Sequence, residues 1–181
     1  MHVTLVNAAP VPGALDRYLE DLASALGRAG HPATEVRLRD LRLHACIGCF
    51  DCWWKHPGVC TFKDDGPDYL RAVIGSDVTV FATPVVMGFA GALARRAAER
   101  VIPLLLPYAE LVQGECHHRK RYDRYPTLGL LLDPAPDTDA EDLAILERAY
   151  ARMALNLRST LRCTRTVHDP IEEVRDALAR A

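Results

Sequence analysis

Four of the six cysteines of this chain gather in one short stretch. They are Cys46, Cys49, Cys52 and Cys60, and their spacing is C-x2-C-x2-C-x7-C. In a compartment that keeps thiols reduced, so dense a cluster favours metal or redox chemistry over disulfides. Trp53 and Trp54 lie inside it and could cover a cofactor or anchor a subunit contact. The cysteine stretch, residues 46–65, is therefore expected to hold a redox cofactor, to cover one, or simply to pack.

Other chemically capable residues give weaker signals. Cys116, His117 and His118 could bind a metal with a distant carboxylate, but adjacent histidines on a loop point in different directions. The basic run 117–121 could meet phosphate groups, although a solvated loop or a subunit contact is favoured. No Ser-His-Asp arrangement, paired-carboxylate motif or phosphate-binding Walker loop is present in the sequence.

Several charged or thiol side chains have simpler structural interpretations. Asp64 and Asp65 are expected to cap the helix that begins near Pro67. A set of three arginines is expected to be solvated, with a lesser option of meeting a nicotinamide phosphate. These arginines are Arg95, Arg96 and Arg100. Cys163, in the last expected strand, is assigned to the core.

The length and amino-acid composition are those of an ordinary globular protein. Residues 1–181 are expected to form one domain, because 49% of them are hydrophobic and 25% are charged. The net charge of -2 indicates neither a nucleic-acid nor an anionic-membrane partner. The apolar segment 101–106 is far shorter than the roughly 20 residues that span a bilayer. The N-terminus does not look like a signal peptide, so a cytoplasmic location is expected.

Strand-like and helix-like segments alternate along the chain, which predicts a parallel sheet covered on both faces. The expected strands are 2–7, 33–41, 77–83, 127–132 and 163–168, and the expected helices are 14–29, 67–74, 91–102, 139–161 and 171–181. Five strands predict the α/β flavodoxin-like three-layer sandwich, with strand order 2-1-3-4-5. Residues 103–126 exceed the usual connection length and are interpreted as an insertion.

Such sheets bind ligands at the carboxyl ends of their strands, where the strand order reverses. Here that position lies between the turn after the first strand, residues 7–14, and the turn after the third, residues 83–91. The second of these turns is small and apolar, so it could lie along a planar ring while its backbone N–H groups reach the polar edge. An ordinary strand-to-helix turn explains the same residues equally well.

Three segments resemble the flavodoxin-like NAD(P)H-dependent FMN oxidoreductases, and most of all the branch that contains the iron–sulfur flavoproteins. These segments are residues 46–53, 59–65 and 81–88. The resemblance implies that FMN is bound. It implies phosphate contacts from Asn7, Ala8, Ala9, Gly13 and Ala14, ring contacts from Thr83, Pro84, Val85, Val86, Met87, Gly88 and Phe89, and a further contact from Asp133.

The first-strand turn departs from that family in its hydrogen-bond donors. Residues 7–16 contain no Ser, Thr, Arg or Lys. Pro10 and Pro12 have no N–H to donate, and Asp16 would place a negative charge close to a phosphate. The sequence therefore supports the fold better than it supports tight FMN binding.

The cysteine stretch keeps three interpretations beside this resemblance. Cys46, Cys49, Cys52 and Cys60 could ligate a 4Fe–4S cluster, as in the iron–sulfur flavoproteins, because cysteines at i, i+3 and i+6 in a tight loop converge and a distant fourth completes the set. They could instead be free thiols near a flavin, or buried packing residues. Structural zinc is less apt, since it usually takes two separated C-x2-C pairs.

The favoured function is an FMN-dependent oxidoreductase, of the NAD(P)H:acceptor or flavin reductase type. The alternatives are an iron–sulfur flavoprotein that carries electrons, and a flavodoxin-like domain that has lost its flavin and acts as a binding or subunit module. The expected partners are a nicotinamide nucleotide or a redox protein. A homodimer is also expected.

Overall fold

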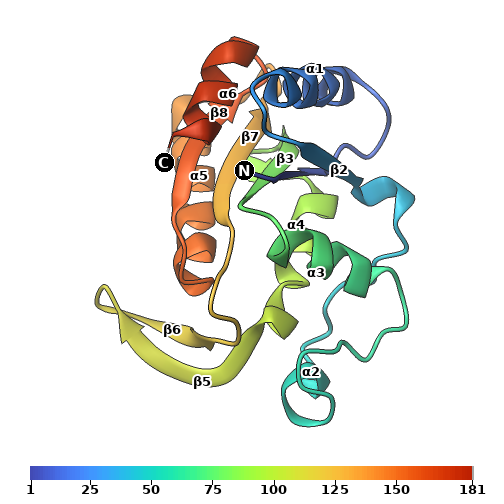
Figure 1. Cartoon of the computed structure of the whole chain (residues 1–181), viewed down its shortest axis with the longest axis vertical. Helices are drawn as coiled ribbons and strands as arrows, with labels where there is room; N and C mark the ends of the chain where they lie inside the picture. The colour runs from blue at the N-terminus through green and yellow to red at the C-terminus, as the bar shows by residue number, and fades with distance from the viewer. Residues whose placement is uncertain (181) are drawn as a thin grey trace.

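The computed structural model describes residues 1–180. Its main sheet contains five parallel strands in the spatial order β2(Ala33–Arg37), β1(Val3–Asn7), β3(Val78–Val86), β7(Thr127–Asp133) and β8(Leu161–Thr166). In chain order this is the predicted 2-1-3-4-5 arrangement, which is confirmed (Figure 1). β1 is buried along its whole length, and β3 for most of it, as expected of central strands covered on both faces.

The five predicted parallel strands are joined by one short strand that the sequence did not predict. The two-residue strand β4(Phe89–Ala90) pairs with β3 in the antiparallel sense, so the sheet has six strands. Met87 and Gly88 adopt positive φ values of 51° and 76°, a backbone geometry that makes a tight two-residue hairpin turn. The segment after β3 therefore folds back on its own strand before the next helix starts.

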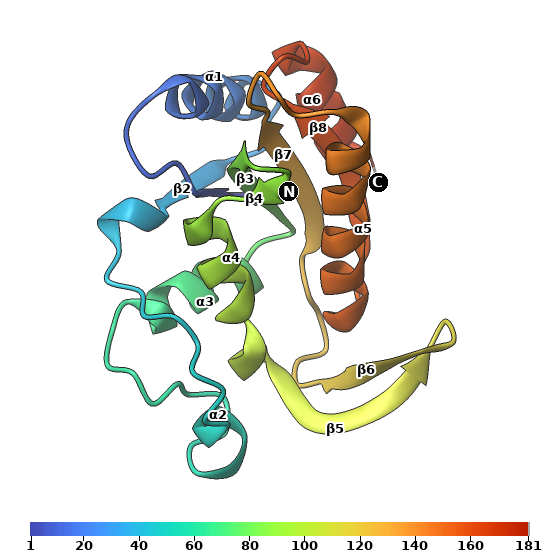
Figure 2. The same cartoon turned by 180° about the vertical axis from the view of Figure 1, so that it is seen from behind.

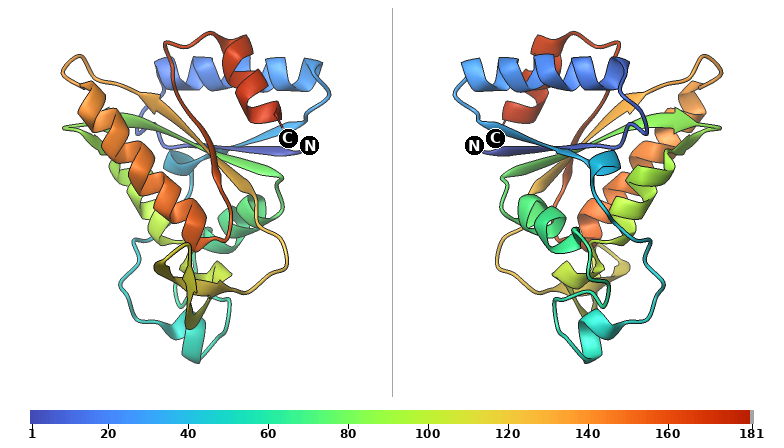
Figure 3. Two further views of the ribbon diagram at one scale, coloured as in Figure 1. Left: turned by 90° about the vertical axis from the view of Figure 1, so that its left-hand side faces the viewer. Right: turned by 90° about the vertical axis from the view of Figure 1, so that its right-hand side faces the viewer.

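The helices form one layer on each face of the sheet (Figure 3). One layer contains α1(Ala14–Arg28) and α6(Ile171–Ala179), and the other contains α3(Gly66–Ile74), α4(Ala92–Glu99) and α5(Ala140–Asn156). Two separate hydrophobic clusters fill the spaces between these layers and the sheet. Successive strand residues face opposite ways. Val80 therefore lies in the cluster beside α1 and α6, and Phe81 lies in the cluster beside α3, α4 and α5.

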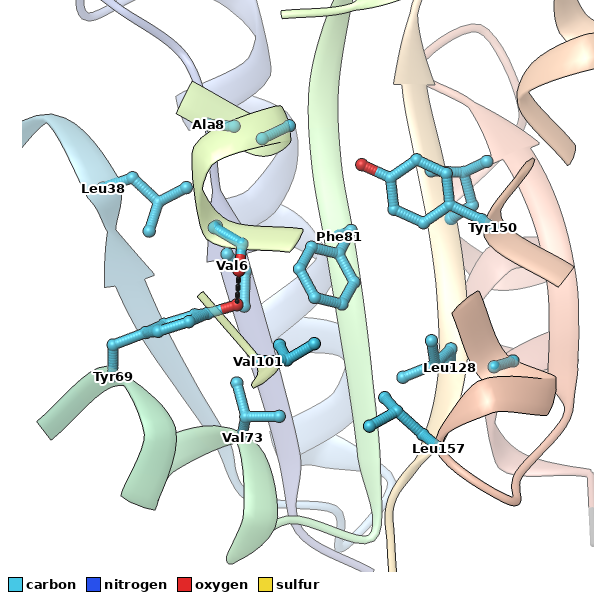
Figure 4. Close-up of a cluster of buried hydrophobic side chains, with 14 of the residues drawn as sticks. Val6, Ala8, Leu38, Tyr69, Val73, Phe81, Val101, Leu128, Tyr150 and Leu157 are labelled. Carbon is cyan, nitrogen blue, oxygen red and sulfur yellow. Dashed lines mark hydrogen bonds between the residues drawn. The ribbon is translucent and has the colours of Figure 1, made fainter. Parts of the chain in front are cut away.

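The cluster beside α3, α4 and α5 supports the side of the sheet that carries the candidate site. Phe81 lies against Tyr150 of α5, with ring centroids 5.6 Å apart, and the Tyr69 hydroxyl donates to the Ala97 carbonyl at 3.0 Å (Figure 4). On the opposite face, Gly129 lets α6 approach β7 closely. A Cβ atom at this position would lie 2.9 Å from Leu178 Cδ2, so no larger residue fits without movement.

The expected insertion at 103–126 contains a hairpin, formed by residues 105–120. The short helix η2(Ile102–Leu104) leads into β5(Leu105–Val112), which pairs with β6(Glu115–Lys120) in a separate two-stranded sheet. This hairpin lies near the end of the molecule that also carries α2(Asp51–Trp54), a single helical turn within the cysteine stretch (Figures 1 and 2).

Several element ends differ from the expected ones for local reasons. β2 stops at Arg37 because the chain turns into the short helix η1(Leu38–Asp40). α5 stops at Asn156, and Arg158 then adopts a positive φ of 56°, which a continuing helix cannot include. α4 is also shorter than expected at both ends. Among the described residues, none of the helices combines the length and apolar character that a bilayer span requires.

Candidate functional site

The structure brings the predicted flavin-binding segments together at the carboxyl ends of the central strands. Asn7 lies opposite Ala82 in the ladder between β1 and β3, and the next N–H, of Ala8, donates to the Ala82 carbonyl at 2.8 Å. Asp133, at the end of β7, is the ladder partner of Pro84. The three turns are therefore neighbours, as the parallel topology requires. Their role in binding FMN stays a prediction.

The first-strand turn is built around the buried carboxylate of Asp16, which is 7% exposed. This carboxylate accepts hydrogen bonds from the Gly13 backbone N–H at 2.8 Å and from the Asn7 side-chain amide at 2.8 Å. It also pairs with the Arg39 guanidinium at 2.7 Å. Burial would raise the pKa of Asp16, but the bonds from Arg39, Gly13 and Asn7 outweigh it and lower the pKa below its usual value. Asp16 is therefore a buried anion that already has its donors.

The FMN phosphate does not fit this turn as it is folded. Asp16 engages the Gly13 N–H, the Asn7 amide and the Arg39 guanidinium, and its charge would repel a second anion at the start of α1. The sequence indicated the acidic charge of Asp16 but gave no sign of Arg39. That arginine comes from η1, which follows β2 and is distant from Asp16 in sequence.

The third-strand turn is apolar and exposed, as its composition predicts. The side chains at its tip are among the most exposed apolar ones in the described chain, with Met87 at 84% and Phe89 at 67%. The Thr83 hydroxyl accepts from the Gly91 N–H at 3.0 Å and so fixes the base of the turn. Asp133 is half-buried, and burial raises its pKa against the opposing effect of His168.

A cavity of about 910 Å3 lies on the outer side of the α4 and α5 layer. Its walls come from the cysteine stretch, α4, α5 and the β6 strand. All four cysteines of the stretch line it, together with Phe50, Phe62, Arg95, Arg100, Tyr150 and Arg152 among others. Of the predicted flavin-binding residues, Phe89 alone lines this cavity. The cavity is thus next to the third-strand turn but away from the first-strand turn.

The four thiols lie close enough to affect one another. Cys46 and Cys49 are exposed, Cys60 is half-buried and Cys52 is buried. Burial and the neighbouring thiols of Cys60, Cys46 and Cys49 raise the pKa of Cys52 to about 11. Within residues 1–180, however, no group of three or more His, Cys, Asp or Glu side chains is arranged to hold a metal ion. The thiols as folded do not fit a 4Fe–4S cluster, and cluster binding stays a prediction.

The other proposed metal ligands have different roles. His117 is 3.1 Å from Glu115, and His118 packs against the Trp53 ring at a centroid distance of 4.7 Å. Cys116 is exposed on β6. These residues therefore lie along a strand, where neighbouring side chains alternate between faces and do not converge.

Arg100 is buried, so the prediction that it is solvated was wrong. The side chain is 1% exposed, and its two terminal nitrogens bind the Asp64 carboxylate at 2.7 and 3.0 Å. The first of these nitrogens also donates to the His44 carbonyl at 2.8 Å. The prediction failed because the cysteine stretch covers the face of α4 that carries Arg100. Arg95, by contrast, is exposed and pairs with Glu99.

The predicted capping by Asp64 and Asp65 is confirmed in part, because Asp65 is the N-cap residue of α3 and the Asp64 carboxylate accepts from the first N–H of that helix. Asp65 occupies the N-cap position of α3 without a side-chain capping bond, and its carboxylate accepts instead from the Arg42 N–H at 2.7 Å. The Asp64 side chain is fully buried and accepts from the His44 and Gly66 N–H groups at 2.9 and 3.0 Å. Asp64 and Arg100 together tie both ends of the cysteine stretch to α4.

Trp53 fastens the middle of the stretch. Its indole N–H donates to the carbonyls of Ile102 and Leu105 at 3.3 and 3.0 Å, so α2 is held against the segment that leads into β5. Trp54, beside it, is 69% exposed. Of the two tryptophans, Trp53 therefore belongs to the fold, and Trp54 is free to contact a partner.

Iodoacetamide is expected to alkylate Cys46 and Cys49 before Cys52. The thiolate is the reactive form, and a buried thiol with a pKa of about 11 is almost fully protonated in mild alkali. Timed labelling followed by peptide mass spectrometry should give a rate for Cys52 at least about tenfold below that for Cys46. Labelling in concentrated urea is the control, because unfolding should remove the difference. Equal rates in the native protein would show that Cys52 is not protected.

No model of a known protein family matches the chain. An iron–sulfur flavoprotein from Archaeoglobus fulgidus is 27% identical over 100 residues, which are 55% of this chain and 48% of that relative. The chain therefore spans about half the length of the curated relative it matches.

Solved structures of low sequence identity share the fold. An FMN-dependent NADH-azoreductase from Bacillus anthracis, in complex with FMN, is 10% identical with a TM-score of 0.65, and the match covers 99% of each chain. A flavodoxin from Streptococcus pneumoniae is 13% identical with a TM-score of 0.58, covering 99% of this chain and 98% of the other. The likeness to NAD(P)H-dependent FMN oxidoreductases is confirmed at the level of the fold, and the chain has the flavodoxin-like architecture.

Proposed function

We propose that this chain is a flavin-dependent oxidoreductase of the FMN-dependent NAD(P)H type. It would take electrons from a nicotinamide nucleotide or a redox protein and pass them to a small acceptor. The observation that carries the proposal is the cavity of about 910 Å3 beside the third-strand turn of a flavodoxin-like sheet. A bound flavin would supply the electron-transfer chemistry, while the chain supplies orientation, electrostatics and shelter from water.

The cavity has the size and lining of a small-molecule site. Ligand pockets usually measure about 300–1,000 Å3 and combine apolar walls with a few polar groups. Here Phe50, Phe62 and Phe89 provide aromatic surface. The Tyr150 hydroxyl is buried and has no hydrogen-bond partner among the described residues, so a polar group of a ligand could satisfy it after a small movement.

Two arginines could recognise the phosphates of a nicotinamide nucleotide. Arg95 and Arg152 both line the cavity, and their side chains are 75% and 60% exposed. Each is held in place by one carboxylate at 2.9 Å, from Glu99 and Glu115 respectively. Such exposed pairs are weak, so a phosphate could compete for the guanidinium groups. Because the first-strand turn does not fit the FMN phosphate, the proposal depends on the ring of the flavin and not on that turn.

Ala149→Trp tests whether the cavity is the reaction site. Ala149 is exposed and lines the cavity, so an indole there would fill part of it. Oxidation of NADH or NADPH by a quinone, with FMN or riboflavin present, should lose at least about tenfold in kcat/KM in this variant. Arg148→Trp is the matched control, since Arg148 is exposed on the same helix but does not line the cavity.

Two results would count against the proposal in different ways. A wild-type protein that oxidises neither nucleotide with either flavin would show that it is not such an oxidoreductase. Activity that is equal in the wild type and in Ala149→Trp would show that the chemistry takes place outside the cavity.

A second candidate is an iron–sulfur electron carrier, favoured because all four cysteines line one cavity. Cys46, Cys49, Cys52 and Cys60 would have to converge further to hold a 4Fe–4S cluster, since they do not fit one as folded. The buried Arg100 beside them would offset part of the negative charge of four thiolates. Anaerobic reconstitution with iron and sulfide should leave about four irons per chain if this candidate is right. Retention of no iron would exclude it.

The proposal includes a homodimer. Apolar side chains remain exposed around the cavity, among them Ile47 at 67% and Phe50 at 48%. Trp54 and Leu111, on the neighbouring segments, are 69% and 81% exposed. Apolar surface of this kind commonly marks an interaction site. If the flavin site proves to be absent, the same surface supports the remaining alternative of a binding or subunit module.

A further inference from the structure

Three separate segments contribute donors to the Asp16 carboxylate. Asn7 comes from the end of β1, Gly13 from the start of α1, and Arg39 from η1 after β2. All three distances lie between 2.7 and 2.8 Å. In this fold the first turn, with the helix that follows it, is the place where a nucleotide or flavin phosphate is bound. A carboxylate of the chain itself therefore occupies an anion position.

Helix capping alone does not explain this arrangement. A carboxylate at the third helical position commonly accepts from the N-cap N–H, which accounts for the Gly13 bond. The bonds from Asn7 and Arg39 cross between elements and are not part of a cap. The side chains of Arg39 and Asp16 are only 15% and 9% exposed, so the pair is largely sheltered from water.

The charge and the hydrogen bonds of these three donors are already taken up. The charge of Arg39 is balanced by Asp16, and the second bond of the Asn7 amide goes to Glu35 at 2.8 Å. The Asn7 side-chain oxygen accepts from the Ala9 N–H at 2.9 Å. An incoming phosphate would meet the Asp16 carboxylate and the three donors that it already uses, and Pro10 and Pro12 have no N–H to offer.

We propose that Asp16 is an internal substitute for the ligand phosphate, and that it makes the first-strand turn select against phosphate. The chain would then bind riboflavin at least as tightly as FMN, with the ring as the recognised part of the ligand. This flavin preference depends on the proposed function, whereas the exclusion of phosphate from the turn does not.

The experiment uses the full chain and three variants. Asp16→Ser removes the anion and supplies a hydroxyl donor, while Asp16→Asn removes the charge and keeps the shape. Asp21→Asn is the control, because it makes the same change of charge at an exposed position of α1. The dissociation constants of FMN and riboflavin are measured by flavin fluorescence. The melting temperature is measured in inorganic phosphate and in chloride of equal ionic strength.

The expected results concern both probes. Wild type and Asp21→Asn should bind FMN no more tightly than riboflavin, and phosphate should raise their melting temperature no more than chloride does. Asp16→Ser should shift the FMN-to-riboflavin affinity ratio toward FMN by at least about tenfold, since it restores charge-assisted bonds from Arg39. Its melting temperature should rise with phosphate. Asp16→Asn should shift the affinity ratio and the phosphate response of the melting temperature in the same direction. It replaces Asp16→Ser in the test if the Ser variant does not fold.

Either of two outcomes would overturn the inference. One is a wild-type protein that binds FMN at least about tenfold more tightly than riboflavin, a result that needs no variant. The other is a folded Asp16 variant whose affinity ratio and phosphate response both match those of the wild type. If no variant binds any flavin, the proposed function fails, and the phosphate response of the melting temperature still decides the role of Asp16.

Discussion

Asp64→Asn is expected to lower the free energy of unfolding by about 3–5 kcal/mol. The change leaves the Arg100 guanidinium, which is 1% exposed, as a buried charge without its carboxylate partner. Two backbone N–H groups, of His44 and Gly66, would also lose an ionised acceptor. Urea denaturation followed by circular dichroism measures the effect, which is a large fraction of the stability of an ordinary domain.

Asp68→Asn is the matched control for this change. Asp68 pairs with Arg71 on the surface of α3, where the two side chains are 74% and 72% exposed. Loss of such a pair should cost at most about 0.5 kcal/mol. If both substitutions lower the free energy of unfolding by the same amount, the buried pair stabilises the fold no more than the exposed pair does. A further sign of the loss would be faster alkylation of Cys52, because Asp64 and Arg100 hold the ends of the stretch that buries it.

The same pair predicts a pH dependence. Burial would raise the pKa of Asp64, but hydrogen bonds from Arg100, His44 and Gly66 outweigh it and lower the pKa well below its usual range. A carboxyl group whose pKa is lowered by folding contributes stability that is fully present above its unfolded pKa, near 3.9. That contribution is lost as the pH falls below this value toward the folded pKa. The stability difference between wild type and Asp64→Asn should therefore shrink in acid.

Phe81→Ala is expected to cost a similar amount, about 3–5 kcal/mol. Phe81 is 1% exposed at the centre of β3, and it packs against Tyr150, which lines the cavity. The substitution leaves a void behind a wall of the proposed site, so it weakens the fold and also removes the support of Tyr150. Urea unfolding measures the loss of stability.

Phe89→Ala provides the comparison for this core substitution. Phe89 is in the strand that pairs with the end of β3, but it is 67% exposed. Its removal should change the free energy of unfolding by less than about 0.5 kcal/mol. If Phe81→Ala lowers the free energy of unfolding by less than about 1 kcal/mol, Tyr150 moves into the space and the cavity wall can rearrange.

The sheet could be predicted from the sequence because its central strands carry their own signal. The segments of β1, β3 and β7 are nearly continuous apolar runs separated by helical patterns, and that order is enough to imply parallel pairing. The hairpin of β5 and β6 has no such pattern. Its second strand, residues 115–120, is almost entirely polar, and its pairing depends on the two-residue turn at Gln113 and Gly114, whose φ values are 51° and 83°.

The site was less predictable because it depends on pairs that are distant in sequence. The positions of Cys46 to Cys60 could be recognised from spacing, but the partners that place them could not. Arg100 looks like a surface residue of an amphipathic helix until a loop from elsewhere covers it. In the same way, Asp16 is a visible acid whose partner, Arg39, is supplied by another element. Local patterns report which face of an element is apolar, and they do not report which loop lies over it.

The indole of Trp53 has a consequence for how a ligand would reach the cavity. One N–H is shared by the carbonyls of Ile102 and Leu105, and the ring lies against His118, so this side chain joins the cysteine stretch to the hairpin. Local opening of either segment breaks the same contacts, and the two should therefore open as one cooperative unit. Entry on this side of the cavity would then depend on the joint opening of the two segments, and not on their separate fluctuations.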